Sequence, residues 1–260
     1  MPEPIPFLAS ETLRRAHFAH GFSTRAGGVS EPPFDSLDFA TLREKSRLRE
    51  NQRRLAAAVG FDGELLYQVH QVHGPALVVA SGDPARVLEQ DADALVAEPG
   101  SGHAVGIRVA DCVPVLVADP RSGRVAAVHA GWRGVVADVI GVAVRHLVEK
   151  GAQAEALLAA IGPCIGPCCF EVGADVGETI ARATTASAIA RRDEARGKVF
   201  VDLRAAVRAQ LLGLGLSGGA IDDVPDATSA GCTRCDAQRF YSYRRDGDSS
   251  GRLIAVIAAR

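Results

Sequence analysis

Two histidines and one cysteine offer the ligand set of a catalytic zinc site. His73 closes the segment LLYQVHQVH, Cys112 separates two apolar runs in RVADCVPVLVADP, and His129 ends an apolar run in VAAVHAGWRGV. Three protein ligands that leave a fourth position for water make zinc-bound water much more acidic. The spacing alone is a weak signal, because the three residues come from separate predicted strands and no compact motif such as HExxH is present.

Each of these residues also has an ordinary structural explanation. An isolated cysteine such as Cys112 is commonly a small buried hydrophobic residue. His70 precedes His73 by three positions, and this odd spacing in a strand would put the two side chains on opposite faces, so we expect only one of them at a metal. His129 precedes a predicted helix, at the kind of sheet edge where α/β proteins place their sites.

Short buried strands would position these residues. Apolar runs separated by Gly, Asp and Pro predict strands over residues 65–69, 76–80, 94–97, 104–109, 113–118, 124–129, 156–161 and 253–258. Helical spacing predicts helices over residues 46–59, from just after His129 to Gly151, and over 174–183 and 203–212. This mixture favours an α/β or α+β fold, a layered domain with mixed β-sheets flanked by helices.

The organisation of the chain predicts one domain over residues 1–260. No internal repeat, low-complexity tract or obvious linker interrupts it. Residues 184–198 (TTASAIARRDEARGK) are polar and predict an exposed, mobile excursion.

The composition indicates a globular protein with a small partner. Hydrophobic residues make up 47% and charged residues 23% of the chain, and the net charge is −2 with both signs interspersed. We therefore expect a small-molecule substrate, no nucleic acid and no membrane. The proline-broken start and the absence of an apolar run of about 18 residues predict a cytoplasmic location. Six cysteines are too few for a disulfide scaffold in a chain of this length.

A series of motifs resembles one known family. In chain order these are HGFSTRAGGVS, QVHG, DADALV, VADCVPVLVAD, VHAGWRGV, IGPCIGPCCFEVG, CTRCD and FYSYRRDGDSSGR. They closely resemble the YfiH-like family, also called laccase-domain or multicopper polyphenol oxidase-like proteins, from about His20 to the C-terminus. The resemblance implies a layered α/β sandwich similar to that of Cys-His deamidating toxins. It also implies a zinc-dependent purine nucleoside phosphorylase that accepts adenosine, inosine and S-methyl-5′-thioadenosine, with adenosine deaminase activity at the same site.

The resemblance assigns the metal ligands residue by residue. They fall on His73 in QVHG, on Cys112 in ADC and on His129 in VHAGWRG, whereas His70 lies outside the match.

Further positions in matching motifs are expected to bind substrate. Arg25 in FSTRAGG and Arg244 in FYSYRRDG are expected to act in catalysis and to bind phosphate or ribose, although an exposed salt-bridging arginine is the alternative for Arg25. Gly27 and Gly28 could form an anion-binding nest of backbone amides beside Arg25. Ser242, in the same segment as Arg244, is also expected to bind substrate.

Two carboxylates and one tryptophan complete the predicted site. In deamination, water activated at the metal would attack the purine C6 while Asp111 or Asp93 carried the proton; in phosphorolysis, phosphate would attack the ribose C1′. Both aspartates have a structural alternative, as a turn cap or as a partner that orients a metal ligand. Trp132 could stack on a purine or equally pack in the core.

The remaining cysteines leave three possibilities open. Cys164, Cys168 and Cys169, together with Cys232 and Cys235, could supply four sulfur ligands to a structural zinc. CTRCD adjoins a predicted loop and the first cluster lacks CxxC spacing, which favours reduced thiols in or near the pocket. A regulatory disulfide between Cys232 and Cys235 is the third possibility.

Three other functions compete with this one. A multicopper oxidase needs many histidines, often in HxH pairs, but the chain has seven histidines, no HxH pair and only Met1 as a methionine; a single copper in the His₂Cys site stays possible. A metal-free hydrolase or amidase would use Cys112 as nucleophile and His129 as base. A factor that edits peptidoglycan precursors, or a partner protein of the cell-wall machinery, is the third.

Overall fold

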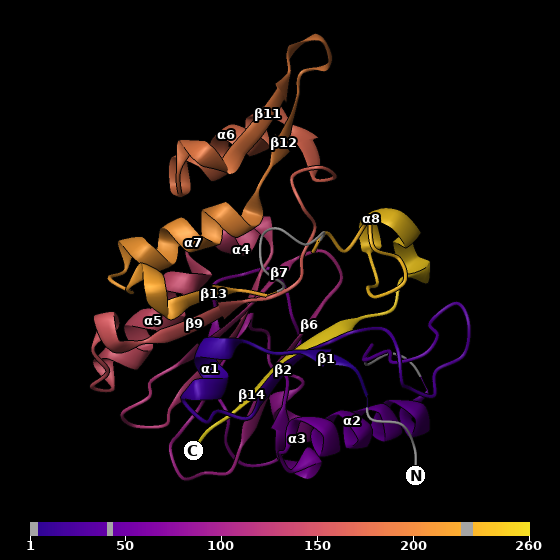
Figure 1. Cartoon of the computed structure of the whole chain (residues 1–260), viewed down its shortest axis with the longest axis vertical. Coiled ribbons are helices and arrows are strands. Elements are labelled where there is room, and N and C mark those ends of the chain that lie inside the picture. Colours follow the sequence, from indigo (N-terminus) through magenta and orange to yellow (C-terminus); the bar gives the residue numbers. More distant parts are fainter. Residues whose placement is uncertain (1–4, 41–43, 225–230) are drawn as a thin grey trace.

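Two mixed β-sheets stacked face to face form the centre of the molecule (Figure 1). The computed structural model describes residues 5–40, 44–224 and 231–260. One sheet runs in the order β13 (Ile221–Asp223), β9 (Leu158–Ile161), β7 (Val113–Ala118), β8 (Val125–Ala130), β5 (Ala94–Ala97) and β4 (Leu77–Val79). The other runs in the order β1 (Phe7–Leu8), β2 (His20–Ser23), β14 (Leu253–Ala258), β6 (Ala104–Val109) and β3 (Leu66–Tyr67).

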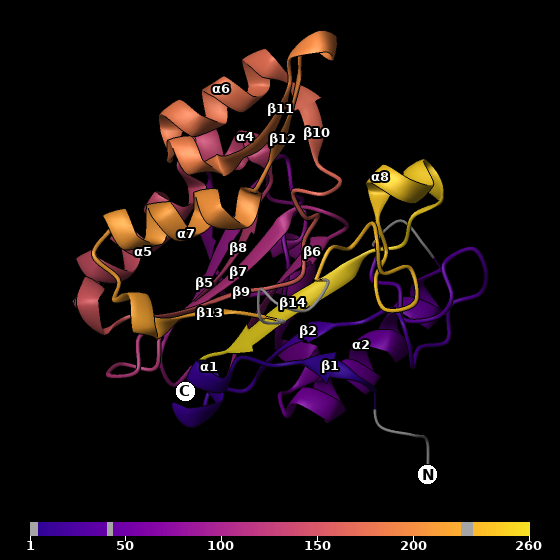
Figure 2. The same ribbon diagram turned by 45° about the horizontal axis from the view of Figure 1, so that its top comes forward.

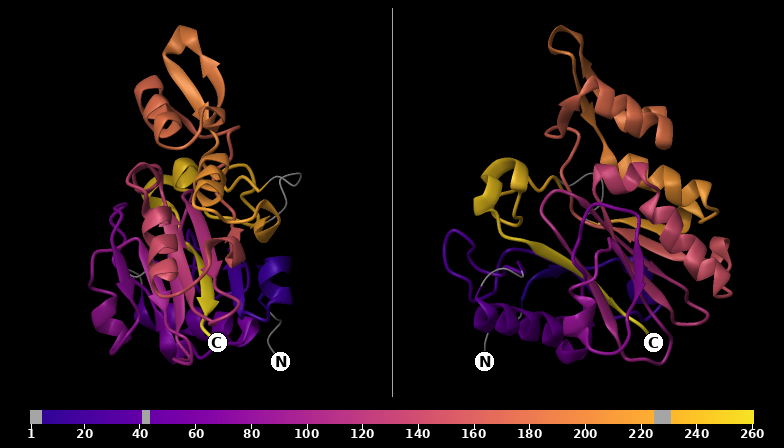
Figure 3. Two further views of the ribbon diagram at one scale, coloured as in Figure 1. Left: turned by 90° about the vertical axis from the view of Figure 1, so that its left-hand side faces the viewer. Right: turned by 180° about the vertical axis from the view of Figure 1, so that it is seen from behind.

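Helices cover the outer face of each sheet (Figures 2 and 3). Three of them pack on the six-stranded sheet, namely α4 (Trp132–Val136), α5 (Val139–Glu149) and α7 (Leu203–Gly213). On the other side, α2 (Lys45–Val59) packs on the five-stranded sheet. The short helices are α1 (Glu11–Arg15), α3 (Pro84–Val87) and α8 (Tyr243–Asp246). The order of layers is therefore helix, sheet, sheet, helix, which confirms the predicted layered α/β sandwich.

The alternation of side chains along β7 explains these layers. Val115 faces the helices and packs in one core with Ile140 of α5. Its neighbour Leu116 points the opposite way and packs with Ile107 of the second sheet. Because both faces of this strand are buried, its sequence is apolar at every position instead of alternating with polar residues. A third core, which includes Leu55 of α2, fills the outer face of the five-stranded sheet.

One predicted element was wrong, and a second was right only in part. The single helix expected after His129 is two helices, because Asp138 takes a left-handed conformation (φ 62°) between α4 and α5 and caps α5 by accepting a hydrogen bond from the Gly141 amide. The excursion expected over residues 184–198 is largely exposed, as predicted, but much of it forms a β-hairpin.

That hairpin consists of β11 (Ile189–Asp193) and β12 (Lys198–Val201), and β12 also pairs with β10 (Glu171–Gly173). Together with α6 (Ala174–Ala183), these strands stand above α7 in Figure 1. Ala188 and Val201 anchor the hairpin in the core, while its outer residues are exposed and therefore polar in sequence.

Candidate metal centre and pocket

The structure brings His73, Cys112 and His129 together at one end of the six-stranded sheet. Cys112 immediately precedes β7, His129 is the fifth residue of β8, and the two strands pair in antiparallel register. His73 arrives on the loop between β3 and β4. One ligand atom from each residue lies within 4.8 Å of those of the other two, and His73 Nε2 is 3.8 Å from Cys112 Sγ. A tetrahedral zinc ion with ordinary bond lengths would separate such N and S ligands by about 3.6 Å. The donor set and its spacing therefore fit a metal ion.

Gly131 permits this close approach. A Cβ atom at Gly131 would lie 2.7 Å from His73 Cδ2 and 3.1 Å from Cys112 Sγ, so a larger residue would push the ligands apart. This glycine stands between His129 and α4, where the chain leaves the strand and turns into the helix.

Asp93 orients two of the three ligands, His73 and His129. It is fully buried, and its carboxylate accepts hydrogen bonds from the backbone amides of Val72 (3.1 Å), His73 (3.0 Å) and Gly74 (2.7 Å). It also accepts one from Nδ1 of His129 at 2.7 Å, which leaves Nε2 of that ring to face the other ligands. These amides hold His73 in a left-handed conformation (φ 62°) that a non-glycine residue rarely adopts.

Cys112 and His129 form a charge-coupled pair in the metal-free protein. Burial raises the pKa of the Cys112 thiol, but the charge of His129 and hydrogen bonds from His129 and His73 outweigh burial and lower its pKa to about 6. Burial lowers the pKa of His129, but the Cys112 thiolate and the hydrogen bond to Asp93 outweigh burial and raise it. The thiolate, which is the form that binds metal, is therefore favoured at neutral pH.

The three ligands open onto a cavity of about 690 Å³. Its lining comprises His70, Gln71, His73, Arg108, Ala110, Asp111, Cys112, His129, Ile165, Phe170, Tyr243, Arg244, Asp248 and Arg252. This volume lies within the range of small-molecule sites. His70 is on this lining but not with the ligands, because its Nδ1 is bonded to Asp91 and its side chain is 67% exposed.

Three arginines line the cavity, together with the two carboxylates of Asp111 and Asp248. Arg108 is bonded to Gln68 Oε1 and the Val69 carbonyl, Arg244 to the Glu171 carbonyl, and Arg252 to backbone carbonyls. None of these three forms an ion pair with a carboxylate within residues 5–40, 44–224 and 231–260. Burial, and then the charge of Arg252, lowers the pKa of Arg108 to about 10, and the group stays cationic at neutral pH.

Arg108 and Arg252 were missed in the sequence. The signal for Arg108 was available, since it is the one charged residue within the otherwise apolar strand β6. A cation placed there needs either a partner or a ligand.

Asp111 and Arg244 both line the large cavity, but the carboxylate of Asp111 already accepts two hydrogen bonds. Its Oδ1 accepts a hydrogen bond from Thr233 Oγ1 (2.5 Å) and its Oδ2 accepts one from the Arg244 amide (2.6 Å). Asp111 therefore ties the pocket wall together and is not placed as a free proton carrier. Ser242 is fully buried and caps α8 by accepting a hydrogen bond from the Arg245 amide, which leaves it off the cavity lining.

The predicted anion clamp at Arg25 is not brought to the metal ligands. Its guanidinium is bonded to the carbonyls of Asp35 and Ala237 and lies 4.8 Å from the ring centre of Tyr241. The Gly28 amide donates to Ser36 Oγ, so it is not free for a ligand; none of Arg25, Gly27 and Gly28 lines the large cavity. Hydrogen bonds within the fold, which motif spacing does not show, occupy the Arg25 guanidinium and the Gly28 amide.

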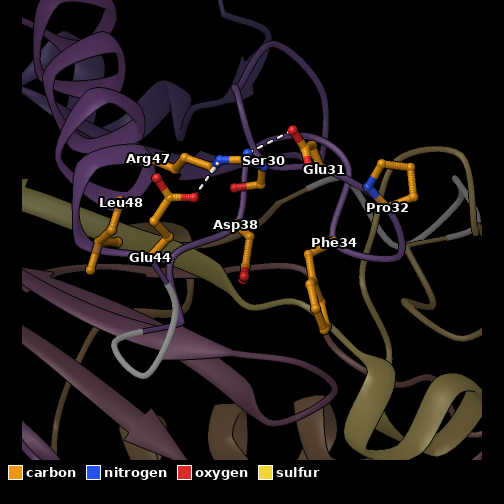
Figure 4. Close-up of a pocket in the computed structure, with 8 residues that line it drawn as sticks. All are labelled: Ser30, Glu31, Pro32, Phe34, Asp38, Glu44, Arg47 and Leu48. Carbon is orange, nitrogen blue, oxygen red and sulfur yellow. Dashed lines mark hydrogen bonds and ion pairs between the residues drawn. The ribbon is translucent and has the colours of Figure 1, made fainter.

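A smaller cavity of about 220 Å³ lies close to that glycine-rich loop (Figure 4). Among the described residues that line it, the one arginine, Arg47, is paired with both Glu31 (2.6 Å) and Glu44 (2.7 Å). These described residues therefore offer no unpaired cation to an anionic ligand.

Asp93 and Trp132 also lie off the lining of the large cavity. Asp93 takes the orienting role described above instead of touching substrate. Trp132, the first residue of α4, packs against the core, and the guanidinium carbon of Arg133 lies 4.5 Å from the centre of its ring. In both cases the structural alternative matches the observed position.

Comparison with known proteins finds a matching family model and several similar proteins. A family model described as "Multi-copper polyphenol oxidoreductase laccase" matches residues 19–260. A purine nucleoside phosphorylase of Deinococcus radiodurans is 39% identical, with 97% of this chain and 92% of that protein covered. Adenosine deaminase RL5, from an unknown prokaryotic organism, is 37% identical, with 81% of each covered.

Solved structures share the fold. Bacillus licheniformis hypothetical protein YfiH has a TM-score of 0.87 at 28% identity, covering 99% of this chain and 97% of that one. YlmD from Geobacillus stearothermophilus has a TM-score of 0.82 at 30% identity, covering 93% and 91%. Within the described part of the chain, no helix is long and apolar enough to cross a membrane.

Proposed function

Because the chain belongs to the multi-copper polyphenol oxidoreductase laccase family, whose relatives include proteins named purine nucleoside phosphorylase and adenosine deaminase, we propose that it is a zinc-dependent purine nucleoside phosphorylase with adenosine deaminase activity at the same site. Its proposed substrates are adenosine, inosine and S-methyl-5′-thioadenosine. The observation that carries the proposal is a three-ligand centre that opens onto a cavity lined by three arginines, none of which forms an ion pair with a carboxylate of the described residues.

The ligand set favours zinc over a multicopper centre. His73, Cys112 and His129 supply two imidazoles and one thiolate, and their side towards the cavity is open. A multicopper oxidase would need further histidines beside them, but the nearest one along the chain, His70, is bonded to Asp91. Zinc held by these residues would supply Lewis-acid catalysis at neutral pH.

Phosphate is the co-substrate that the arginines would bind. Arg108, Arg244 and Arg252 each retain N–H donors that can face an anion in the cavity. A phosphate oxygen would attack C1′ of the ribose, the bond from C1′ to the purine nitrogen would break, and its electron pair would leave with the base. The base then takes up one proton, so the products are ribose 1-phosphate and the free purine.

The other residues position the reactants. Asp93 fixes the ring of His129 through its Nδ1 proton, and Asp111 holds the backbone of Arg244 at the cavity wall. Phe170 and Tyr243 line the same cavity and offer aromatic surface to a purine. Tyr243 is 51% exposed, which suits a residue at the mouth of the site.

Metal analysis combined with a nucleoside assay tests this proposal. Purified protein would be assayed with adenosine and with inosine, with and without phosphate, and the free base, ribose 1-phosphate and inosine would be quantified. We expect phosphate-dependent release of base from both nucleosides and phosphate-independent formation of inosine from adenosine. The His73→Ala variant should lose the metal of this centre and both activities, whereas His70→Gln should keep its metal content.

Three results would contradict the proposal. Full activity after chelation, together with complete inactivation by a thiol-alkylating reagent, would instead support a metal-free hydrolase with Cys112 as nucleophile. Several coppers per chain and phenol oxidation at enzymatic rates would support the oxidase. Absence of any nucleoside turnover by metal-loaded protein would refute both proposed reactions and leave precursor editing as the alternative to test.

A further inference from the structure

Four cysteines from two distant segments meet outside the lining of the large cavity. Cys168 and Cys169 lie on the loop between β9 and β10, and Cys232 and Cys235 lie more than 60 positions further along the chain. Their four Sγ atoms all lie within 4.8 Å of one another. The Sγ atom of Cys235 is 3.3 Å from that of Cys169 and 3.7 Å from that of Cys168.

These distances suit a shared metal ion. Zinc–sulfur bonds of about 2.3 Å in a tetrahedral site separate the sulfur atoms by about 3.8 Å, whereas a disulfide brings two of them to about 2.0 Å. All four residues are free thiols in the structure, the distances of Cys235 Sγ to Cys168 Sγ (3.7 Å) and Cys169 Sγ (3.3 Å) are close to the tetrahedral value, and no two of the four sulfur atoms are more than 4.8 Å apart. Tetrahedral sites made of sulfur alone are typical of zinc and iron–sulfur centres.

The backbone around the cluster is built for close approach. Cys169 lies in a tight turn in which its amide donates to the Gly166 carbonyl, and the Cys235 amide donates to the Cys232 carbonyl in a second turn. Gly166 faces the cluster: a Cβ atom there would lie 3.1 Å from Cys232 Cβ and 3.3 Å from Cys168 Sγ. An isolated parallel β-bridge between the backbones of Cys164 and Cys232 joins the two turns.

The charge near the cluster is also suitable. Four thiolates around a divalent ion carry a net charge of −2, and Arg234 places its Nη1 3.4 Å from Cys169 Sγ. The fifth cysteine nearby, Cys164, does not belong to the group. It is buried, and its Sγ lies 3.8 Å from Arg204.

We propose that Cys168, Cys169, Cys232 and Cys235 bind one zinc ion in a structural site separate from the His73–Cys112–His129 centre. The ion cross-links the loop between β9 and β10, which contributes Ile165 and Phe170 to the wall of the large cavity, to the segment that leads into α8, whose Tyr243 and Arg244 also line it.

The neighbours of the cysteines show what this cross-link fixes. The residue after Cys169 is Phe170, which lines the cavity. The residue after Cys232 is Thr233, whose hydroxyl donates to Asp111 beside the metal ligand Cys112. Removal of the ion therefore loosens the cavity wall without removing any residue that touches the substrate.

Zinc stoichiometry separates the two sites. Wild-type protein loaded with zinc under reducing conditions should bind about two ions per chain, and the double variant His73→Ala/Cys112→Ser should bind about one. The complementary variant Cys232→Ser/Cys235→Ser should also bind about one, while the matched thiol control Cys164→Ala keeps about two. Cobalt in His73→Ala/Cys112→Ser should give the charge-transfer absorption of about four thiolates per ion.

Two results would overturn this proposal. The first is about one zinc per wild-type chain and none in His73→Ala/Cys112→Ser, which would leave only the first centre. The second is a disulfide that forms within the cluster even in protein kept under reducing conditions. It would be detected because the protein mass is lower by two hydrogen atoms and because two fewer thiols can be titrated. Because wild type and His73→Ala/Cys112→Ser retain all four cysteines, the stoichiometry stays decisive even if Cys232→Ser/Cys235→Ser does not fold. Neither measurement depends on nucleoside turnover.

Discussion

Replacement of Asp93 by asparagine should damage both the stability of the fold and the metal centre. Each carboxylate oxygen accepts two hydrogen bonds: Oδ1 from the His73 amide and His129 Nδ1, and Oδ2 from the amides of Val72 and Gly74. An asparagine side chain has one oxygen and one NH₂ group. In either orientation, its NH₂ group therefore faces two N–H donors that have lost their acceptor.

The magnitude follows from these contacts. Hydrogen bonds to a charged group contribute about 1.5–3 kcal/mol each, and breaking a buried charged network costs about 3–5 kcal/mol. We expect Asp93→Asn to lower the free energy of unfolding by about 3–5 kcal/mol. Because the Nδ1 proton of His129 loses its carboxylate acceptor, zinc affinity should also fall by about 10–100-fold.

Urea unfolding and zinc competition against a chelator measure the two effects. Asp119→Asn is the matched control, because Asp119 is also buried and accepts several hydrogen bonds, but in the turn between β7 and β8. The control should lose stability and keep its zinc affinity. Asp93→Asn protein with a free energy of unfolding within about 1 kcal/mol of wild type, or with the zinc affinity of the control, would refute the reasoning.

The pH dependence gives a further check on the same residue. Burial raises the pKa of Asp93, but its hydrogen bonds from His129 and the backbone amides outweigh burial and lower it. A carboxyl with a lowered pKa stabilises the fold above its unfolded pKa of about 3.9, and this stabilisation is lost as the pH falls through the folded pKa. The difference in stability between wild type and Asp93→Asn should therefore narrow below about pH 4.

Three other predictions test the centre and the cavity. Gly131→Ala should lower zinc affinity by at least about tenfold, because the added Cβ lies 2.7 Å from His73 Cδ2; unchanged affinity in a competition titration would contradict this. Arg108→Met should raise the KM for phosphate by about tenfold or more, with a much smaller change in the KM for inosine. Steady-state kinetics measure both constants, and an equal increase in the two would argue against phosphate binding at Arg108. In metal-free protein, alkylation of Cys112 followed by peptide mass analysis should reach half its plateau rate near pH 6, because the charge of His129 holds the thiol pKa at about 6. With His129→Ala the midpoint should move upward, since burial then acts without that charge; an unmoved midpoint would show that His129 is not the cause.

The layered fold was predictable from the sequence because its strands are buried on both faces. The predicted bounds of β6 and β7 agree with those observed, since turn residues end both apolar runs, and only Arg108 of β6 interrupts them. The break at Asp138 was not predictable from hydrophobic spacing, because the apolar positions continue across it with helical period. The left-handed conformation of Asp138 and its capping bond from the Gly141 amide separate the two helices.

The candidate site was predictable in part. Motif resemblance led to His73, Cys112 and His129, and the structure brings them together. Arg25 illustrates the opposite case, because its guanidinium is taken up by carbonyls of residues 10 and 212 positions away, contacts that no local motif reveals.

The position of β14 has a consequence for how the protein is made. This strand, formed by Leu253–Ala258, lies between β2 and β6 and pairs with both. Until it has been synthesised, these two strands lack their neighbour and present open edges, which favour pairing with other chains. The five-stranded sheet therefore cannot close before residues 253–258 have left the ribosome. A chain truncated before Leu253 should accordingly accumulate as aggregates instead of a smaller soluble domain.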